Sequence, residues 1–586
     1  MTVSETEANA PPEDVNGAEA AGLLTGRWPR RLWLVVALQA LLMLCTTVLY
    51  PAFQNPDEYA HVDYVIAHRD GQWFDGPGQR QFQSGVVKAD SLVPNIQWRL
   101  HVAKPPVARS ARASFDALGT APQNAERTNQ MVQHPPLYYG LAAGYSYLVP
   151  HFSQQPFDWQ VFWLRFLSML LLLPVPLLIF GSARRIGGSE NLALLAALIP
   201  LSIPTYLRTG ASVTNDSLLA LVGTVLLALL VRVAWGDLSR RTAIWVGLVW
   251  GAALLTKGFA LALPPAIVLA YLLGARGAIA ARVRAAWRPA VISGGIGAAL
   301  GGWWWIRNLL VYGAVQPQGF GDISDTLRQT IFGRDRPGGT DVAFFKSFVL
   351  LLAQRGWGSI GLLDNPGLDN RLLWSMSGTF VLVLVFGLVV AVRPFRDRFA
   401  LSLPNRWNLG RAVLLLLPTM LILGVLYVGS RTVYLQGQQL AGVQIRYLLP
   451  ALLGQVLLAA VALHVMLRRL DRWLAPVLLT GTVAFLALSA NEVLDLEMSS
   501  SKASYQIRME DAFRFVVGWA PFPTALTVCL LILTVIVTVV SLVAFWAPAL
   551  RQPRPSYRPE WEQIHALRPS APGIAGIAGI AGDAAD

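Results

Sequence analysis

The stretch 32-LWLVVALQALLMLCTTVLYPAFQNPDEYAHVDY-64 decides the class of fold, because a polar segment follows directly on an apolar run. Residues 32–50 are long enough to cross the hydrocarbon core of a bilayer, which takes about 20 helical residues. Arg27, Arg30 and Arg31 precede the run, and no small-residue cleavage site follows it. These features predict a signal-anchor helix that is retained in the mature protein.

The composition of the whole chain also indicates a membrane protein. Of its 586 residues, 54% are hydrophobic and 14% are charged, and the mean hydropathy is +0.47. A soluble protein rarely reaches that apolar fraction. The net charge of +13 comes from basic residues in short loops between apolar runs, as in cytoplasmic loops, so we expect no nucleic-acid partner. Cys45 and Cys529 both lie in apolar runs, which leaves no disulfide framework and no cysteine metal site.

Apolar runs recur along the chain and predict an all-α, polytopic membrane protein with about twelve spans. The predicted spans are 32–50, 160–181, 191–207, 217–235, 242–256, 258–274, 289–311, 373–392, 412–429, 447–467, 473–490 and 521–547. The stretch 242–274 is either two short helices or one kinked unit around Thr256, Lys257 and Gly258.

Basic residues in the loops predict the orientation of these spans. All of the following fall on one side, which is cytoplasmic if both termini are inside: Arg184, Arg185, Arg240, Arg241, Arg276 to Arg288, Arg393 to Arg411, Arg468, Arg469, Arg472, Arg551 and Arg554. The long segments 51–159, 312–372, 430–446 and 491–520 then lie outside, and we expect the first to carry short interfacial helices.

The ends of the chain differ from the membrane domain, 27–550. Residues 1–26 are acidic and rich in alanine, which predicts a disordered cytoplasmic tail, and 551–586 form a low-complexity cytoplasmic tail. Only five of the 47 basic residues are lysine, a bias typical of GC-rich bacterial genomes. We therefore expect a multi-pass protein of a bacterial cytoplasmic membrane.

Polar residues gather at the span ends on the predicted outer side. Two acids, Asp57 and Glu58, follow the first span, and the other members are Arg165, Arg208, Asn215, Asp216, Lys257, Arg307 and Arg446. Charged groups near hydrocarbon are costly unless they are paired or face water, so the clustering indicates a functional site. Snorkelling and span-end anchoring would explain many of these residues one by one, but not two adjacent acids, Asp57 and Glu58, beside five bases on one leaflet.

The motif PDEYAH offers several roles for its acids. Pro56 suits the first turn of a short helix, and Asp57 and His61 would then share a face at i, i+4. This spacing could hold a divalent metal, although two or three ligands make a weak motif. A carboxylate here could also act as a general base. The structural alternative is that Asp57 or Glu58 caps the helix and complements its dipole.

Two further motifs carry candidate residues, each with a structural alternative. In HPPLYYG the diproline predicts a turn into an interfacial helix, or else His134 and Tyr138 line an acceptor groove. In TNDSLL a helix begins, with Asn215 or Asp216 as its cap, or else these residues belong to the outer polar site.

Three cations lie at the depth that a lipid-linked phosphate would reach. Lys257, Arg307 and Arg446 each flank a predicted span, and Arg307 follows three tryptophans in 302-GWWWIRN-308. The tryptophans suit an aromatic belt, and a lipid-phosphate site is the second interpretation. Arginine matches phosphate oxygens bidentately while lysine acts as a point charge, and a transferase needs such groups on a departing phosphate.

Taken together, these motifs resemble the type C integral-membrane glycosyltransferases. The resemblance covers about residues 30–550, and rests on the order of PDEYAH and HPPLYY in the first outer segment, followed by 214-TNDSL-218, 256-TKG-258, 305-WIRNLLVYG-313 and 446-RYLLP-450. More narrowly, PDEYAH, RNLLVYG and RYLLP are similar to the bacterial domain-of-unknown-function family numbered 2142.

The resemblance implies transfer of a sugar from a polyprenyl-phosphate donor, at the outer membrane face, to an envelope glycan, lipid or protein acceptor. It implies that the base is an acid of the first outer segment, which is Asp57 here, with Glu58 as second candidate. Some relatives use a divalent metal and others none, so the metal question stays open. Two rival functions are a transporter or flippase of a lipid-linked glycan, and a non-catalytic scaffold of envelope assembly.

Overall fold

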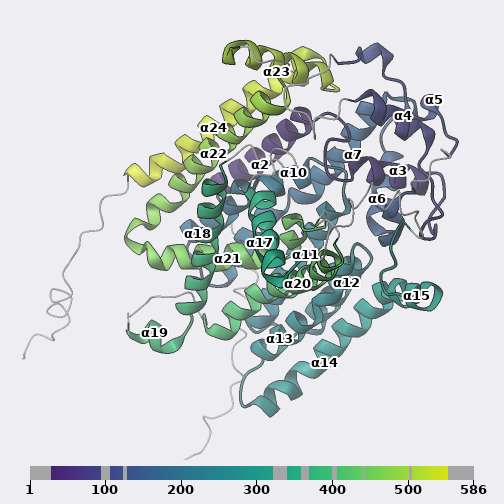
Figure 1. Ribbon diagram of the computed structural model, residues 1–586. Helices are drawn as coiled ribbons and strands as arrows, with labels where there is room; N and C mark the ends of the chain where they lie inside the picture. Colours follow the sequence, from purple (N-terminus) through teal and green to yellow (C-terminus); the bar gives the residue numbers. More distant parts are fainter. Residues whose placement is uncertain are drawn as a thin grey trace, which may run out of the picture.

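The computed structural model describes residues 28–93, 106–122, 128–320, 339–357, 369–398, 406–437, 440, 442–499 and 504–551. Within these ranges the chain is helical, and the β pairing consists of two isolated bridges, Gln81 with Thr128 and Gln83 with Pro122 (Figure 1). The predicted tail 1–26, and the tail 551–586 apart from Arg551, lie outside the described residues.

Eight helical stretches of the described chain are long and apolar enough to cross a membrane. They are α2 (Arg30–Leu49), α7 (Phe157–Leu172) with α8 (Val175–Arg185), α11 (Asn215–Ala234), α18 (Asn370–Val389), α20 (Leu409–Leu435), η8 (Ile445–Ala451) with α21 (Leu452–Met466), η9 (Arg468–Leu470) with α22 (Asp471–Glu497), and α24 (Thr524–Arg551). A ninth is bent by 75° between α9–η5 (Glu190–Ser202) and α10 (Pro204–Gly210). The predicted all-α polytopic fold is confirmed, but the count of twelve is not.

The remaining predicted spans fall short because their helices are brief or interrupted. The stretch 242–274 forms two short helices, α12 (Arg240–Leu254) and α13 (Pro264–Gly274), separated by η6 (Gly258–Ala262). The predicted span 289–311 falls in α14 (Ile279–Gly297), a π-helical turn, Ala298–Gly302, and α15 (Trp303–Tyr312), which follow one another without a gap. This stretch is not among those that are long and apolar enough to cross a membrane.

The segment between α2 and α7 carries the short helices expected of it. They are α3 (Glu58–Arg69), α4 (Ser84–Leu92), η2 (Arg109–Ala111), α5 (Phe115–Leu118), η3 (Gln130–Gln133), α6 (Leu137–Ser146) and η4 (Phe152–Gln154). Figure 1 shows α3 to α6 gathered on one side of the molecule. Their fully buried aromatic side chains, including Tyr64, Phe115 and Tyr139, form a hydrophobic core with α7 and with α23 (Tyr505–Trp519). Two further helices are α17 (Asp341–Trp357) and α19 (Arg393–Arg398).

Two spans lie at the centre of the bundle. Protein buries 67% of α11 and 78% of the stretch Ile445–Met466, against 17% of α18 and 11% of α24. α11 packs directly against η8. Residues at the first turns of α11 and η8 therefore sit on elements that neighbours hold from several sides, which is what a precisely oriented site requires.

Candidate active site

A buried ion pair holds the segment that follows α2. Glu58 is fully buried and accepts hydrogen bonds from Arg165 of α7, at 2.8 Å (Nε to Oε1) and 2.5 Å (Nη2 to Oε2). Its oxygens also accept from the backbone N–H groups of Phe53 and Val213, at 3.0 and 2.9 Å, and from Asn55 Nδ2 at 3.3 Å. A carboxylate that is fully buried and accepts this many hydrogen bonds is closed to a substrate.

Arg165 and Arg208, both at span ends in the sequence, hold the backbone around Glu58. Arg165 donates to the carbonyl oxygens of Thr47, Tyr50 and Pro51, at 3.0, 2.7 and 2.8 Å. Arg208 of α10 donates to Asn55 Oδ1 at 3.0 Å and to the carbonyl of Gln54 at 2.9 Å. Both guanidinium groups thus satisfy backbone groups left unpaired where α2 ends. Their role is to tie α2, α7 and α10 together at the entrance to α3.

Asp57 is placed quite differently from its neighbour. It occupies the N-cap position of α3, but its side chain makes no capping hydrogen bond. Its backbone is left-handed, with φ 60° and ψ 8°, a conformation that is uncommon for residues other than glycine and that concentrates at functional sites. The side chain is 44% exposed, and its Oδ2 lies 3.1 Å from Nη2 of Arg446. The carboxylate is therefore presented to solvent beside a cation and does not cap the helix.

Asp57 is one end of a chain of alternating charges contributed by four separate elements. Arg446, at the start of η8, also lies 3.2 Å from Asp216 (Nε to Oδ2), in the first turn of α11. Asp216 Oδ1 accepts from Lys257 Nζ at 2.6 Å, and Lys257 lies between α12 and η6. Arg446, Asp216 and Lys257 are all buried. We call Asp57, Arg446, Asp216 and Lys257 the charge cluster.

The start of α11 keeps Asp216 available for these cations. The expectation that Asn215 or Asp216 caps this helix is wrong, because the cap is Thr214, whose hydroxyl accepts from the backbone N–H of Asp216 at 3.3 Å. A side chain that capped its own helix would be turned away from its neighbours. Both predicted cap residues instead contact Lys257, and Asn215 Oδ1 accepts from its Nζ at 3.3 Å.

One aromatic residue that the sequence analysis did not single out completes the cluster. The ring of Tyr447 lies 4.5 Å from Lys257 Nζ and 5.5 Å from Arg446 Cζ, and it packs on Phe259 at 4.9 Å between centroids. A shared aromatic face attracts both cations and limits where they can move. The available signal was its position in RYLLP, directly after Arg446.

Two uncharged histidines stack near the charge cluster. The rings of His61 and His134 are 6.4 Å apart and 7° from parallel, and His61 Nδ1 lies 2.9 Å from Tyr139 OH. Burial, followed by the charge of Lys257, lowers the pKa of His134 to about 3. Burial and the neighbouring His134 hold the pKa of His61 well below its usual range. In the described part of the chain, His134 Nδ1 is buried without a hydrogen-bond partner.

Two other candidates lie apart from the charge cluster. Tyr138 is fully buried, with its hydroxyl 3.5 Å from Ser168 Oγ, so it belongs to the core of the first segment. Arg307 donates to Tyr312 OH at 3.3 Å, and its guanidinium faces the ring of Trp304 at 5.4 Å. None of its contacts within the described ranges reaches Lys257 or Arg446. Arg307 thus lies among the rings of Phe74, Trp304 and Tyr312.

The metal hypothesis finds little support in the donor set. Across the described ranges, no three His, Cys, Asp or Glu side chains are grouped as ligands of one ion would be. Asp57 and Asp216 contact cationic side chains, and His61 contacts Tyr139 and not Asp57. The charges of the two acids are therefore already offset by protein groups.

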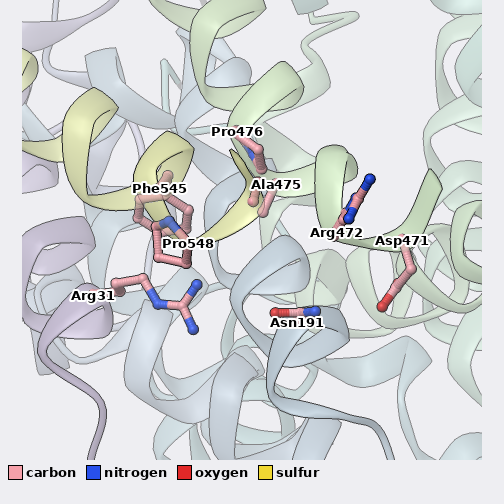
Figure 2. Close-up of a pocket in the computed structure, with 9 residues that line it drawn as sticks. Arg31, Asn191, Asp471, Arg472, Ala475, Pro476, Phe545 and Pro548 are labelled. Atoms are coloured by element: carbon pink, nitrogen blue, oxygen red, sulfur yellow. The ribbon is translucent and has the colours of Figure 1, made fainter. Parts of the chain in front are cut away.

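A surface pocket lies at the other end of α2 from Asp57. Figure 2 shows Arg31 and Phe545 on one side of it, and Asp471 and Arg472 on the other. Because α2 has 20 residues, its ends are about 30 Å apart. The pocket takes no part in the charge cluster, and Arg31 there is paired with Glu190 at 2.7 Å.

Part of the chain matches the model of a known family. Residues 133–293 match the family described as dolichyl-phosphate-mannose-protein mannosyltransferase. The matched range is less than half of the chain, but it contains His134, Asp216 and Lys257. It supports the wider resemblance to glycosyltransferases that use lipid-linked sugars. The narrower resemblance to the family numbered 2142 is not shown. No curated protein matches the sequence.

The chain is similar to several solved structures. ArnT from Cupriavidus metallidurans, bound to undecaprenyl phosphate, is 16% identical, with 88% of this chain and 74% of that chain covered and a TM-score of 0.45. The oligosaccharyltransferase of Archaeoglobus fulgidus, in complex with Zn and sulfate, is 13% identical, with 78% and 52% covered and a TM-score of 0.42. The chain spans about half the length of that second protein.

Proposed function

We propose that this protein transfers a sugar from a polyprenyl-phosphate donor to a glycan, lipid or protein of the cell envelope. The observation that carries the proposal is the charge cluster, in which the exposed carboxylate of Asp57 lies beside the buried Arg446, and Asp216 links Arg446 to a second buried cation, Lys257. The family match on residues 133–293 supports the same reaction class. We place the reaction at the outer face of a bacterial cytoplasmic membrane, with both chain termini in the cytoplasm.

The proposed reaction is a single displacement at the anomeric carbon of the donor. Asp57 accepts the proton of an acceptor hydroxyl as its oxygen forms a bond to that carbon. The bond between the anomeric carbon and the phosphate oxygen breaks, and its electron pair leaves with the polyprenyl phosphate. Arg446 and Lys257 stabilise the negative charge that develops on this leaving group, in a buried environment where their effect is larger than in water.

The contacts of the two adjacent acids favour Asp57 over Glu58 as the base. Both oxygens of Glu58 accept hydrogen bonds within the fold, whereas Asp57 is half-exposed and makes one side-chain contact with Arg446. A general base must reach the proton that it removes. His61 and His134, which are buried and stacked close to the cluster, are proposed to line the wall of the site on the acceptor side.

The proposal is tested by deleting the gene and comparing envelope glycans by mass spectrometry. We expect one sugar to disappear and to return with the native gene. Asp57→Asn should cut transfer at least about 100-fold, the lower end of general-base contributions, and should not restore the sugar. Asp70→Asn is the matched control, because Asp70 ends the same helix and accepts from Gln83 instead of a cation. Restoration by Asp57→Asn would remove the base from the mechanism, and an unchanged glycan profile after deletion would refute the activity.

A further inference from the structure

We propose that the donor phosphate displaces Asp57 from Arg446, so that binding of the substrate itself frees the general base. This inference rests on the proposed function and concerns how its site is regulated. In the structure the acid that should take the proton is bound to a cation that should hold the phosphate. The carboxylate of Asp57 and the phosphate of the donor would thus compete for the same edge of the Arg446 guanidinium.

The two acids that contact Arg446 are not equivalent. Asp216 is 1% exposed and also accepts from Lys257 at 2.6 Å, so removing it would leave buried cations unpaired. Asp57 is 44% exposed and contacts Arg446 through one hydrogen bond, at 3.1 Å. Half-exposed ion pairs contribute at most about 1 kcal/mol, because water solvates the separated carboxylate well. Asp57 is therefore the partner that an incoming anion can replace, while Asp216 keeps Arg446 in position.

The outer edge of Arg446 suits a phosphate better than it suits Asp57. Its Nη2 donates to Asp57 and its Nη1 lies 3.4 Å from the carbonyl of Pro56, a long contact. A phosphate group can accept from both nitrogens of a guanidinium at once. Lys257 lies on the same Tyr447 ring and adds a second positive charge. Displacement would break the weak ion pair between Asp57 and Arg446 and form a bidentate contact between the phosphate and Arg446.

Competition between Asp57 and phosphate for Arg446 would also help to release the polyprenyl phosphate after transfer. The donor is a phosphodiester with one negative charge, whereas the leaving polyprenyl phosphate is a monoester with about 1.5 to 2 negative charges at pH 7. Asp57 has just taken a proton and is neutral, so it does not compete for Arg446 at this stage. When Asp57 loses that proton to water, its carboxylate competes again and favours departure of the phosphate. Each turnover would thus return the protein to the ion-paired state.

The test measures binding of farnesyl phosphate, a short polyprenyl phosphate, to the full chain purified in detergent. Asp57→Asn removes the competing charge and keeps the size of the side chain, and asparagine also tolerates a left-handed backbone. We expect the variant to bind farnesyl phosphate up to about fivefold more tightly than the native protein does, the factor that corresponds to about 1 kcal/mol. Farnesol, which lacks the phosphate, should bind both proteins equally, and inorganic phosphate measures the headgroup alone.

Two further variants separate competition from other effects of the substitution. Asp70→Asn removes the same charge from the other end of α3 and should leave farnesyl phosphate binding unchanged. Combining Asp57→Asn with Arg446→Gln should abolish the tightening, since the contested cation is gone. Equal or weaker binding by Asp57→Asn overturns the inference. That outcome leaves the proposed function intact if the variant has also lost transfer, whereas retained transfer by the variant removes Asp57 as the base. The function itself is refuted by an unchanged glycan profile after deletion of the gene.

Discussion

Replacing Glu58 with glutamine should lower the free energy of unfolding, and any loss of sugar transfer should follow from that loss of stability. The native carboxylate accepts from two nitrogens of Arg165 and from the backbone N–H groups of Phe53 and Val213, and no part of it is exposed. Glu58→Gln keeps the shape but removes the charge, so Arg165 remains buried without a counter-ion. Breaking one side of a buried pair costs about 3–5 kcal/mol. We expect a loss of that size in the free energy of unfolding.

The assay is unfolding of the detergent-solubilised protein by increasing SDS, followed by circular dichroism and tryptophan fluorescence. Asp57→Asn is the comparison within the same segment, and it should change the unfolding free energy by at most about 1 kcal/mol, since its ion pair is half-exposed. The double variant Glu58→Gln/Arg165→Met should cost less than the sum of its two single variants, because no buried charge is left unpaired.

A different outcome would refute this account of the two acids. If Glu58→Gln unfolds like the native protein and yet loses sugar transfer, the buried pair is not what stabilises the entrance to α3. Glu58 would then be the stronger candidate for the base, and the contacts of Arg165 would have to change when substrate binds.

Three other predictions concern the backbone and pH. Gly223→Ala should lower the free energy of unfolding by about 1–3 kcal/mol and reduce transfer, because the added Cβ would lie 2.5 Å from the carbonyl oxygen of Pro450 in η8, the element that carries Arg446. Gly424→Ala is the control, because its added Cβ would have no atom within 4 Å. Asp57→Val should destabilise by about 1–2 kcal/mol relative to Asp57→Gly in the same SDS titration, since a β-branched residue fits a left-handed backbone poorly. The pKa of His134 is about 3 in the native state and about 6.5 when unfolded, so between these values the unfolded chain binds one more proton than the native chain. The free energy of unfolding should therefore fall as the pH drops below about 6.5, by up to about 1.4 kcal/mol per pH unit. His134→Gln should reduce that slope.

Sequence reasoning succeeded where the property depends on local composition. Long apolar runs predict membrane helices because a bilayer-spanning segment must satisfy its own backbone, and each of the eight observed stretches overlaps a predicted run. The count of twelve was not confirmed, because the predicted spans 242–256 and 258–274 form the short helices α12 and α13, and no described stretch over 289–311 is both long and apolar enough to count as a span. Thr214 displaced the predicted caps of α11, since neighbouring polar residues compete for the same N–H groups.

The sequence by itself determined that this is a helical membrane protein with acids and bases at the ends of its spans, because the length of an apolar run and the positions of charges depend only on the local sequence. Only the tertiary structure decided which of those charges meet. Asp57 and Glu58 are adjacent and chemically alike, but Glu58 begins α3 while Asp57 precedes the helix with a left-handed backbone, so their side chains point in different directions. One is therefore enclosed by Arg165, and the other meets Arg446, far away in the chain. Such pairings depend on how distant helices pack, which no local pattern encodes.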